Sequence, residues 1–279
     1  MENNENKKLY NYQDLKTKII QNSNSSKNSD IINFDVKRTF VIQDKEANQE
    51  KVSHILKAVI EAIPEISYNQ GMNFIVGFLL NIINLKNEDK EKDEIEEEVF
   101  YLFLGLFTST SYGELFKNNL ELLKKFYYIL ERLISIFIPE LNAFFQNNNI
   151  KISYFTTSWF ITLFTNVFQN INLNYEPKIL LKILDFFLFY GWKSILVTSI
   201  VLIKNYEYKI MSLKSEQLLP FLNNDIIKES FFDNENLDKF MKEFNNFKVD
   251  EELIKRIEKE FDIKSKNPKI SKKLRFQII

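Results

Sequence analysis

Apolar residues recur at steps of three and four positions along most of this chain, and this spacing constrains the fold more than any other feature. Between residues 52 and 63 the apolar side chains share one face of a helix, which Pro64 is expected to end. Residues 115–137 show the same pattern. With only 5 Gly and 5 Pro among 279 residues, the chain lacks material for the many turns of a β-sandwich or barrel. The sequence therefore predicts an all-α fold.

The same spacing predicts helices along the rest of the chain. They are expected at 72–85, 99–107, 157–168, 179–189 and 193–204, with shorter amphipathic helices at 215–222, 236–244 and 249–261. Residues 1–30 are rich in Asn, Lys and Ser around one apolar patch, which predicts a polar segment with one short helix. The last residues carry several Lys and one Arg and are expected to form a solvated basic tail.

The most apolar stretch, residues 186–203, is long enough to suggest a membrane span. However, Gly191, Trp192 and Lys193 lie near its middle, and a charged side chain is costly inside a bilayer. Two buried helices of a soluble core that meet at Gly191 are therefore the favoured interpretation. A membrane-embedded helical protein stays open as an alternative.

Composition excludes several classes of chemistry. The chain has no Cys and a single His, His54, which excludes disulfides, thiol nucleophiles, Cys-ligated zinc and His-cluster metal sites. His54 lies beside the apolar face of its helix and is interpreted as a structural residue. Residues 86–98 form a mostly acidic run without Gly, which indicates a solvated loop and helix start rather than a calcium loop.

Charge and motif content limit the possible partners. A net charge of −1 provides no electrostatic drive toward nucleic acid or an anionic membrane. The sequence contains no GxGxxG motif and no Gly-rich loop that ends in Gly-Lys-Ser or Gly-Lys-Thr, so we expect the chain to bind no nucleotide or other cofactor by itself. The first eight residues lack the apolar core of a secretory signal, which predicts a cytoplasmic protein.

Two short segments carry polar side chains where packing does not require them: residues 32–39 and 67–73. In the first, Asp35 and Arg38 are three positions apart, so on a helical turn the carboxylate can approach the guanidinium and limit its rotamers. In the second, Gln70 lies in a loop directly before an apolar helix, where a side chain can be presented to a partner. Taken separately, these features also fit a surface ion pair and a hydrogen-bonding loop residue.

Together and in this order, the two segments resemble the signature motifs of the TBC-domain family, the Rab GTPase-activating proteins. Ile32, Asp35 and Arg38 fill the motif IxxDxxR, and Tyr68, Gln70 and Gly71 fill YxQG. The resemblance continues downstream, where residues 158–164 are similar to a helix signature of the family and 183–192 to its aspartate-containing helix with the Gly turn that follows. It covers about residues 9–225.

The resemblance implies a two-lobed all-α domain that stimulates GTP hydrolysis by a GTP-bound Rab-family GTPase and so regulates vesicle trafficking. By similarity, Arg38 is the arginine finger and Gln70 the glutamine finger. Asp35 orients the arginine, while Tyr68 and Gly71 shape the loop that carries Gln70. GTP and Mg²⁺ then belong to the partner, and membrane association is at most peripheral, on endomembranes.

The resemblance also divides the chain into segments. We expect an N-terminal helical lobe with the catalytic motifs at 31–130, a C-terminal helical lobe at 131–225, and a helical extension with the basic tail at 226–279. The family's basic N-terminal segment with its RGxxW-like stretch is not found before these motifs. The alternative function is therefore a catalytically inactive TBC-like scaffold that binds a small GTPase without stimulating turnover.

Overall fold

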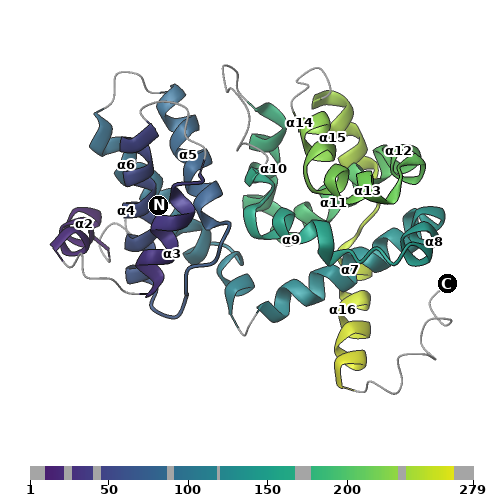
Figure 1. The fold of residues 1–279 in the computed structure, drawn as a ribbon. Coiled ribbons are helices and arrows are strands. Elements are labelled where there is room, and N and C mark those ends of the chain that lie inside the picture. Colours follow the sequence, from purple (N-terminus) through teal and green to yellow (C-terminus); the bar gives the residue numbers. More distant parts are fainter. Residues whose placement is uncertain are drawn as a thin grey trace. The chain divides into compact units, whose positions relative to one another are not determined.

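The computed structural model describes residues 10–21, 27–39, 45–86, 91–117, 120–166, 177–231 and 237–266. Every regular element in these ranges is a helix (Figure 1), which confirms the predicted all-α class. The chain forms two compact units, each built from two stretches of sequence. The first contains residues 1–120 and 158–184, and the second contains 121–157 and 185–279.

The first unit is organised around a central helix, α4. Its elements are α2 (Tyr12–Gln21), α3 (Lys27–Val36), α4 (Lys45–Ala62), α5 (Met72–Lys86), α6 (Lys92–Thr108) and the short 3₁₀ helix η1 (Gly113–Phe116). Helix α4 packs against α2, α3, α5 and α6, and α5 also contacts α3 and α6 (Figure 1). Because α5 has neighbours on several sides, ten of its residues are buried, which explains its nearly continuous apolar sequence.

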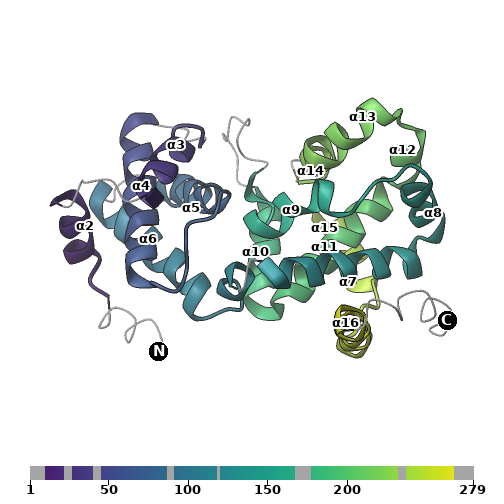
Figure 2. The same ribbon diagram turned by 60° about the horizontal axis from the view of Figure 1, so that its bottom comes forward.

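The second unit is built along two long helices, α7 and α11. Its elements are α7 (Glu121–Phe137), α8 (Pro139–Asn147), α11 (Trp192–Asn205), α12 (Glu207–Ser212), α13 (Ser215–Pro220), the π-helical turn η4 (Phe221–Asp225), α14 (Ile226–Phe231), α15 (Leu237–Asn246) and α16 (Glu251–Lys266). Helix α7 contacts α8, α11 and α16 (Figure 2). The boundaries between the two units fall within α9 (Ser153–Thr162) and α10 (Lys178–Tyr190).

Several helix ends lie where the sequence predicts them. Helix α4 ends at Ala62, two residues before Pro64. Gly191 separates α10 from α11 with a positive φ of 58°, a conformation that glycine adopts without steric cost. The apolar stretch around Gly191 is therefore two helices. None of the helices in the described ranges combines the length and apolar character that crossing a membrane requires.

Two predicted helices span positions at which the observed helix ends or is interrupted by residues with positive φ angles. The helix expected at 157–168 ends at Thr162, because Leu163 and Phe164 adopt positive φ angles of 49° and 65°. Both side chains are fully buried, and the Phe164 amide donates to the Trp159 carbonyl over 3.1 Å, so packing and a helix-capping bond offset the backbone strain. Residues 167 and 168 lie outside the described residues.

The helix expected at 115–137 is interrupted in a similar way. The chain forms η1 first, and α7 begins only at Glu121, after Leu120 with a φ of 61°.

The predicted segments 31–130, 131–225 and 226–279 divide the chain along its sequence, whereas the observed units each combine separate stretches. The segment boundaries stay predictions.

The sequence predicted that the acidic run at 86–98 is solvated, but part of this run is buried. Helix α6 contains Glu96, whose side chain is only 1% exposed. Its carboxylate accepts hydrogen bonds from the Tyr12 hydroxyl over 2.6 Å and the Lys16 ammonium over 2.8 Å, and His54 Nδ1 lies 3.2 Å from Oε1. This buried cluster joins α2, α4 and α6, and it gives the single histidine the structural role that its position predicted.

The partners of Glu96 determine its ionisation. Burial alone raises the pKa of a carboxyl group, but the hydrogen bonds from His54, Lys16 and Tyr12 outweigh it and lower the pKa of Glu96 below the ordinary value of 4.5. Burial and the nearby Glu96 charge raise the pKa of Tyr12, so its hydroxyl stays a donor. The ionised carboxylate is thus favoured in the folded state, and it stabilises the fold at pH values above 4.5.

We expect Glu96→Gln to lower the free energy of unfolding at pH 7 by about 2–4 kcal/mol, since it removes a buried charge that three groups surround. In the parent chain this stabilisation is lost as the pH falls below 4.5 through the lowered pKa of Glu96. The variant should therefore lose less stability over that pH range. Urea denaturation from pH 7 to pH 3 measures both effects.

The control is Glu65→Gln, which changes an exposed carboxylate in the loop after α4. It should keep the parental stability at pH 7. An unchanged stability of Glu96→Gln at pH 7 would contradict the structural role given to this cluster.

Candidate functional site

Asp35 and Arg38 form an ion pair at the C-terminal end of α3. The helix ends in a tight turn, in which the amides of Arg38 and Thr39 donate to the carbonyls of Asp35 and Val36 over 3.0 and 2.9 Å. This turn lets the Arg38 guanidinium reach back to the Asp35 carboxylate. The Asp35 side chain is 4% exposed and the Arg38 side chain 54% exposed. A buried carboxylate therefore holds a guanidinium that stays accessible.

The loop between α4 and α5 presents Gln70 at the surface. The turn requires Gly71, which has a φ of 117°, a conformation that side chains with a Cβ rarely adopt. Space is also limited, since a Cβ at this position would lie 2.6 Å from Ile161 Cγ2. The Gly71 amide donates to Asn73 Oδ1 over 3.0 Å, which ties the turn to the first residues of α5.

A buried hydrogen-bond network joins these two segments. The Tyr68 hydroxyl donates to Asp35 Oδ2 over 3.0 Å and lies 3.2 Å from Asn73 Oδ1. Asn73 Nδ2 donates to Thr39 Oγ1 over 2.8 Å, and Thr39 Oγ1 in turn donates to the Asp35 carbonyl over 3.2 Å. Because every link is buried, the network fixes the end of α3 against the start of α5.

The protonation state of Tyr68 supports this arrangement. Burial raises the pKa of the Tyr68 hydroxyl, and the adjacent Asp35 charge raises it further. The hydroxyl therefore stays protonated at physiological pH and can donate to the carboxylate. Asp35 then has one oxygen bonded to Arg38 and the other to Tyr68.

The structure brings four of the five predicted site residues together. Asp35, Arg38, Tyr68 and Gly71 are linked through hydrogen bonds, partly by way of Asn73. Gln70 is exposed in the turn directly before Gly71.

Thr39 and Asn73 also belong to this site, although the sequence did not single them out. Both are polar and nearly fully buried. The only sequence signal was their position, since Thr39 directly follows Arg38 and Asn73 lies two residues after Gly71. Their pairing across 34 residues requires the folded chain.

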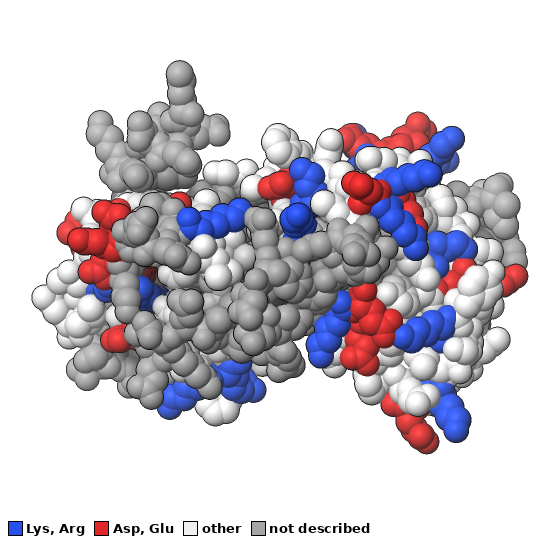
Figure 3. Space-filling view, turned by 90° about the horizontal axis from the view of Figure 1, so that it is seen from above, with Lys and Arg blue, Asp and Glu red and all other residues white. Residues whose placement is uncertain are grey.

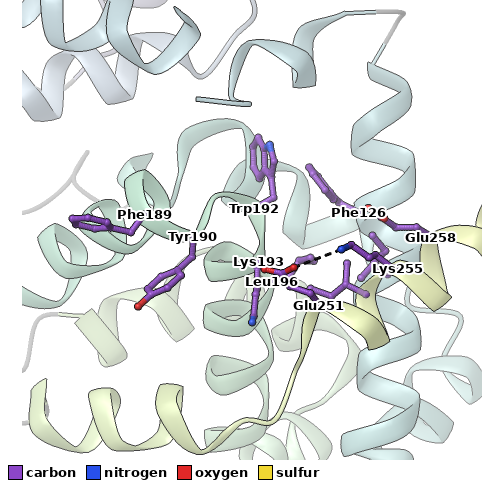
Figure 4. Close-up of a pocket in the computed structure, with 11 residues that line it drawn as sticks. Phe126, Phe189, Tyr190, Trp192, Lys193, Leu196, Glu251, Lys255 and Glu258 are labelled. Atoms are coloured by element: carbon purple, nitrogen blue, oxygen red, sulfur yellow. Dashed lines mark ion pairs between the residues drawn. The ribbon is translucent and has the colours of Figure 1, made fainter. Parts of the chain in front are cut away.

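A separate pocket lies within the second unit, between α7, α11 and α16 (Figure 4). It has a volume of about 340 Å³, and its lining includes Phe126, Tyr190 and Trp192. At its rim Lys255 pairs with Glu251 over 3.6 Å. This pocket includes none of the predicted site residues, all of which belong to the first unit.

Charged side chains of both signs occur near one another on the face shown in Figure 3, in keeping with the net charge of −1.

Within the described part of the chain, no group of three or more Asp, Glu or His side chains could hold a metal ion. The site presents an accessible guanidinium and an accessible amide.

An all-α domain with a guanidinium and an amide presented from two linked segments is the arrangement that the resemblance to GTPase-activating proteins implies. Residues 1–211 match the Rab-GTPase-TBC domain family. The chain belongs to this family.

Curated relatives agree with this membership. The Rab GTPase-activating protein eat-17 of Caenorhabditis elegans is 27% identical over 235 residues, which cover 83% of this chain and 24% of eat-17. The ecotropic viral integration site 5 protein homolog of Homo sapiens is 28% identical over 236 residues, covering 83% of this chain and 26% of the relative. The chain thus spans about a quarter of the length of these relatives.

Solved structures show the same fold. The flagellar RabGAP TBC domain of Chlamydomonas matches with a TM-score of 0.65 and 20% identity, over 87% of this chain and 74% of that one. The Ypt/Rab-GAP domain of Gyp1p matches with a TM-score of 0.66 and 16% identity, over 84% of this chain and 77% of that one.

We expect Gly71→Ala to lower the free energy of unfolding by about 2 kcal/mol, because the new Cβ strains the backbone and meets Ile161. The matched control is Gly105→Ala in α6, where a Cβ meets no atom within 4 Å. Removing a helical glycine should raise stability by up to about 1 kcal/mol. Urea denaturation of both variants measures the difference, and equal effects would contradict the strained turn.

Proposed function

We propose that this chain is a GTPase-activating protein that stimulates GTP hydrolysis by a Rab-family small GTPase in its GTP-bound form. In this proposal Arg38 and Gln70 complete the partner's active site in trans. Family membership and the names of the relatives support the class of activity. The observation that carries the catalytic assignment is the accessible Arg38 guanidinium held by the buried Asp35 carboxylate.

The proposed chemistry follows from what limits GTP hydrolysis. Negative charge develops on the phosphate oxygens in the transition state, and the attacking water must be aligned with the bond that breaks. The Arg38 guanidinium would donate hydrogen bonds to these oxygens, and the Gln70 amide would orient the water. GTP and Mg²⁺ would be held by the partner, so this chain would supply only side chains and bind no cofactor of its own.

Preorganisation explains why the surrounding network matters for this activity. A free arginine side chain loses rotamer entropy when it enters a partner's active site, which weakens transition-state binding. The ion pair with Asp35 removes part of that cost before the partner arrives, because it limits the rotamers of Arg38. Tyr68 in turn holds Asp35. Asp35, Tyr68 and Gly71 therefore act as supporting residues.

We propose the cellular role on the basis of the proposed activity. A Rab-directed activator acts on membrane vesicles, so regulation of vesicle trafficking from the cytoplasm, with at most peripheral contact with endomembranes, follows from the proposed substrate. Since the chain spans about a quarter of its curated relatives, these statements concern the domain described above.

We expect Arg38→Ala to lower the stimulated rate of GTP hydrolysis by about 1,000-fold or more, in the range typical of arginine fingers. Gln70→Ala should also abolish most of the stimulation, because the attacking water loses its orienting group. The measurement is single-turnover hydrolysis by a panel of GTP-loaded Rab proteins, with and without the chain.

Matched controls are Arg256→Ala in α16 and Gln21→Ala at the end of α2, since both side chains are exposed and outside the site. They should stimulate hydrolysis like the parent chain. Parental stimulation by both site variants would refute the two-finger mechanism. A parent chain that binds the GTP form of a Rab without raising turnover would instead support the scaffold function.

A further inference from the structure

Phe34 is a large aromatic side chain on the surface of α3, directly before Asp35. Phe34 is 65% exposed, whereas Ile32 and Val36 on the same helix are buried. Asn33 points to α4, where its Oδ1 accepts hydrogen bonds from Ser53 and Lys57, each over 2.9 Å. Packing of α3 against α4 therefore does not account for a phenyl ring at position 34.

The Phe34 ring lies beside the guanidinium of Arg38. Arg38 Cζ lies 4.7 Å from the centre of the Phe34 ring, well inside the 6 Å limit for a cation–π interaction. Arg38 is thus held by two neighbouring residues in different ways. Asp35 accepts a hydrogen bond from one guanidinium nitrogen, and Phe34 contacts the guanidinium through its ring.

These two contacts differ in how many N–H donors of the Arg38 guanidinium they leave for a partner. A guanidinium has five N–H donors, and each hydrogen bond to Asp35 occupies one of them. The contact with an aromatic ring occupies none, because the attraction comes from the negative ring face. The ring can therefore fix the orientation of the guanidinium and leave its donors for phosphate oxygens. The attraction also becomes stronger when water is excluded, as happens when a partner covers the site.

We propose that Phe34 is a positioning residue for Arg38, and that its ring holds the guanidinium in the orientation that reaches the partner's phosphates. This inference rests on the proposed function of Arg38 and deepens it. Asp35 sets the position of the guanidinium from within the fold, and Phe34 restricts its rotation from the surface side. A simple apolar contact between Phe34 and the partner is the competing role, and it predicts a different kinetic effect.

The first test examines the free chain by NMR and needs no activity. A proton above an aromatic ring is shielded, so the Arg38 Nε–Hε resonance should lie upfield in the parent chain and in Phe34→Tyr, which keeps the ring. It should move downfield in Phe34→Leu. Since the residue is mostly exposed, the variants should fold, and their circular dichroism melting curves check this. An unchanged resonance in Phe34→Leu would overturn the proposal.

The second test separates rate from binding in single-turnover hydrolysis. Phe34→Leu should lower the maximal stimulated rate roughly two- to five-fold, which corresponds to an exposed cation–π interaction. The concentration of chain that gives half-maximal stimulation should stay near the parental value. Phe34→Tyr should restore the rate. The matched control is Phe189→Leu, which removes an exposed ring from α10 in the second unit and should change neither quantity.

Arg38 variants show whether Phe34 acts through the arginine. In the Arg38→Ala background, Phe34→Leu should cause no further loss of rate. If Phe34→Leu changes only the half-maximal concentration, Phe34 is a partner contact and the proposal is overturned while the function of Arg38 stands. If Arg38→Ala keeps the parental rate, both this inference and the proposed function are overturned.

Discussion

The buried carboxylate of Asp35 is the group on which the candidate site depends. A carboxylate that leaves water must be compensated by charges or hydrogen bonds, and here Arg38 and Tyr68 each bond one of its oxygens. Arg38 comes from the same helix end, but Tyr68 comes from a loop 33 residues later. The need to satisfy one buried charge therefore connects the two motif segments, and Asn73 and Thr39 complete that connection.

Some helix boundaries were predictable because they depend on local signals. Pro64 and Gly191 end or separate helices through their own backbone preferences. The end of α9 was not predictable in this way, since Leu163 and Phe164 are ordinary helix residues by composition. Their left-handed conformations are stable because both side chains reach the core. That compensation exists only in the tertiary structure.

The candidate site was predictable only where it depends on residues that are close together in the sequence. The spacing of Asp35 and Arg38 predicted their ion pair, and the loop before α5 predicted the exposure of Gln70. Long-range partners gave no comparable signal. Glu96 belongs to a charged run that suggested solvent, yet it is buried by groups 42 to 84 residues away. Whether a charged residue is exposed or buried depends on such partners, and a single sequence does not reveal them.

The turn at Gly71 rests on a helix end that lies 90 positions later in the chain. Ile161 Cγ2 lies 2.6 Å from the place that a Cβ at position 71 would occupy, and the Tyr112 hydroxyl donates to the Ile161 carbonyl over 2.6 Å, which holds this part of α9 in place. A ribosome releases the chain from its N-terminus, so the two signature motifs leave it long before residue 161 does. The nascent first 120 residues therefore lack Ile161, the side chain that limits the space at this turn, and the close fit between α9 and Gly71 forms only after residue 161 has been synthesised.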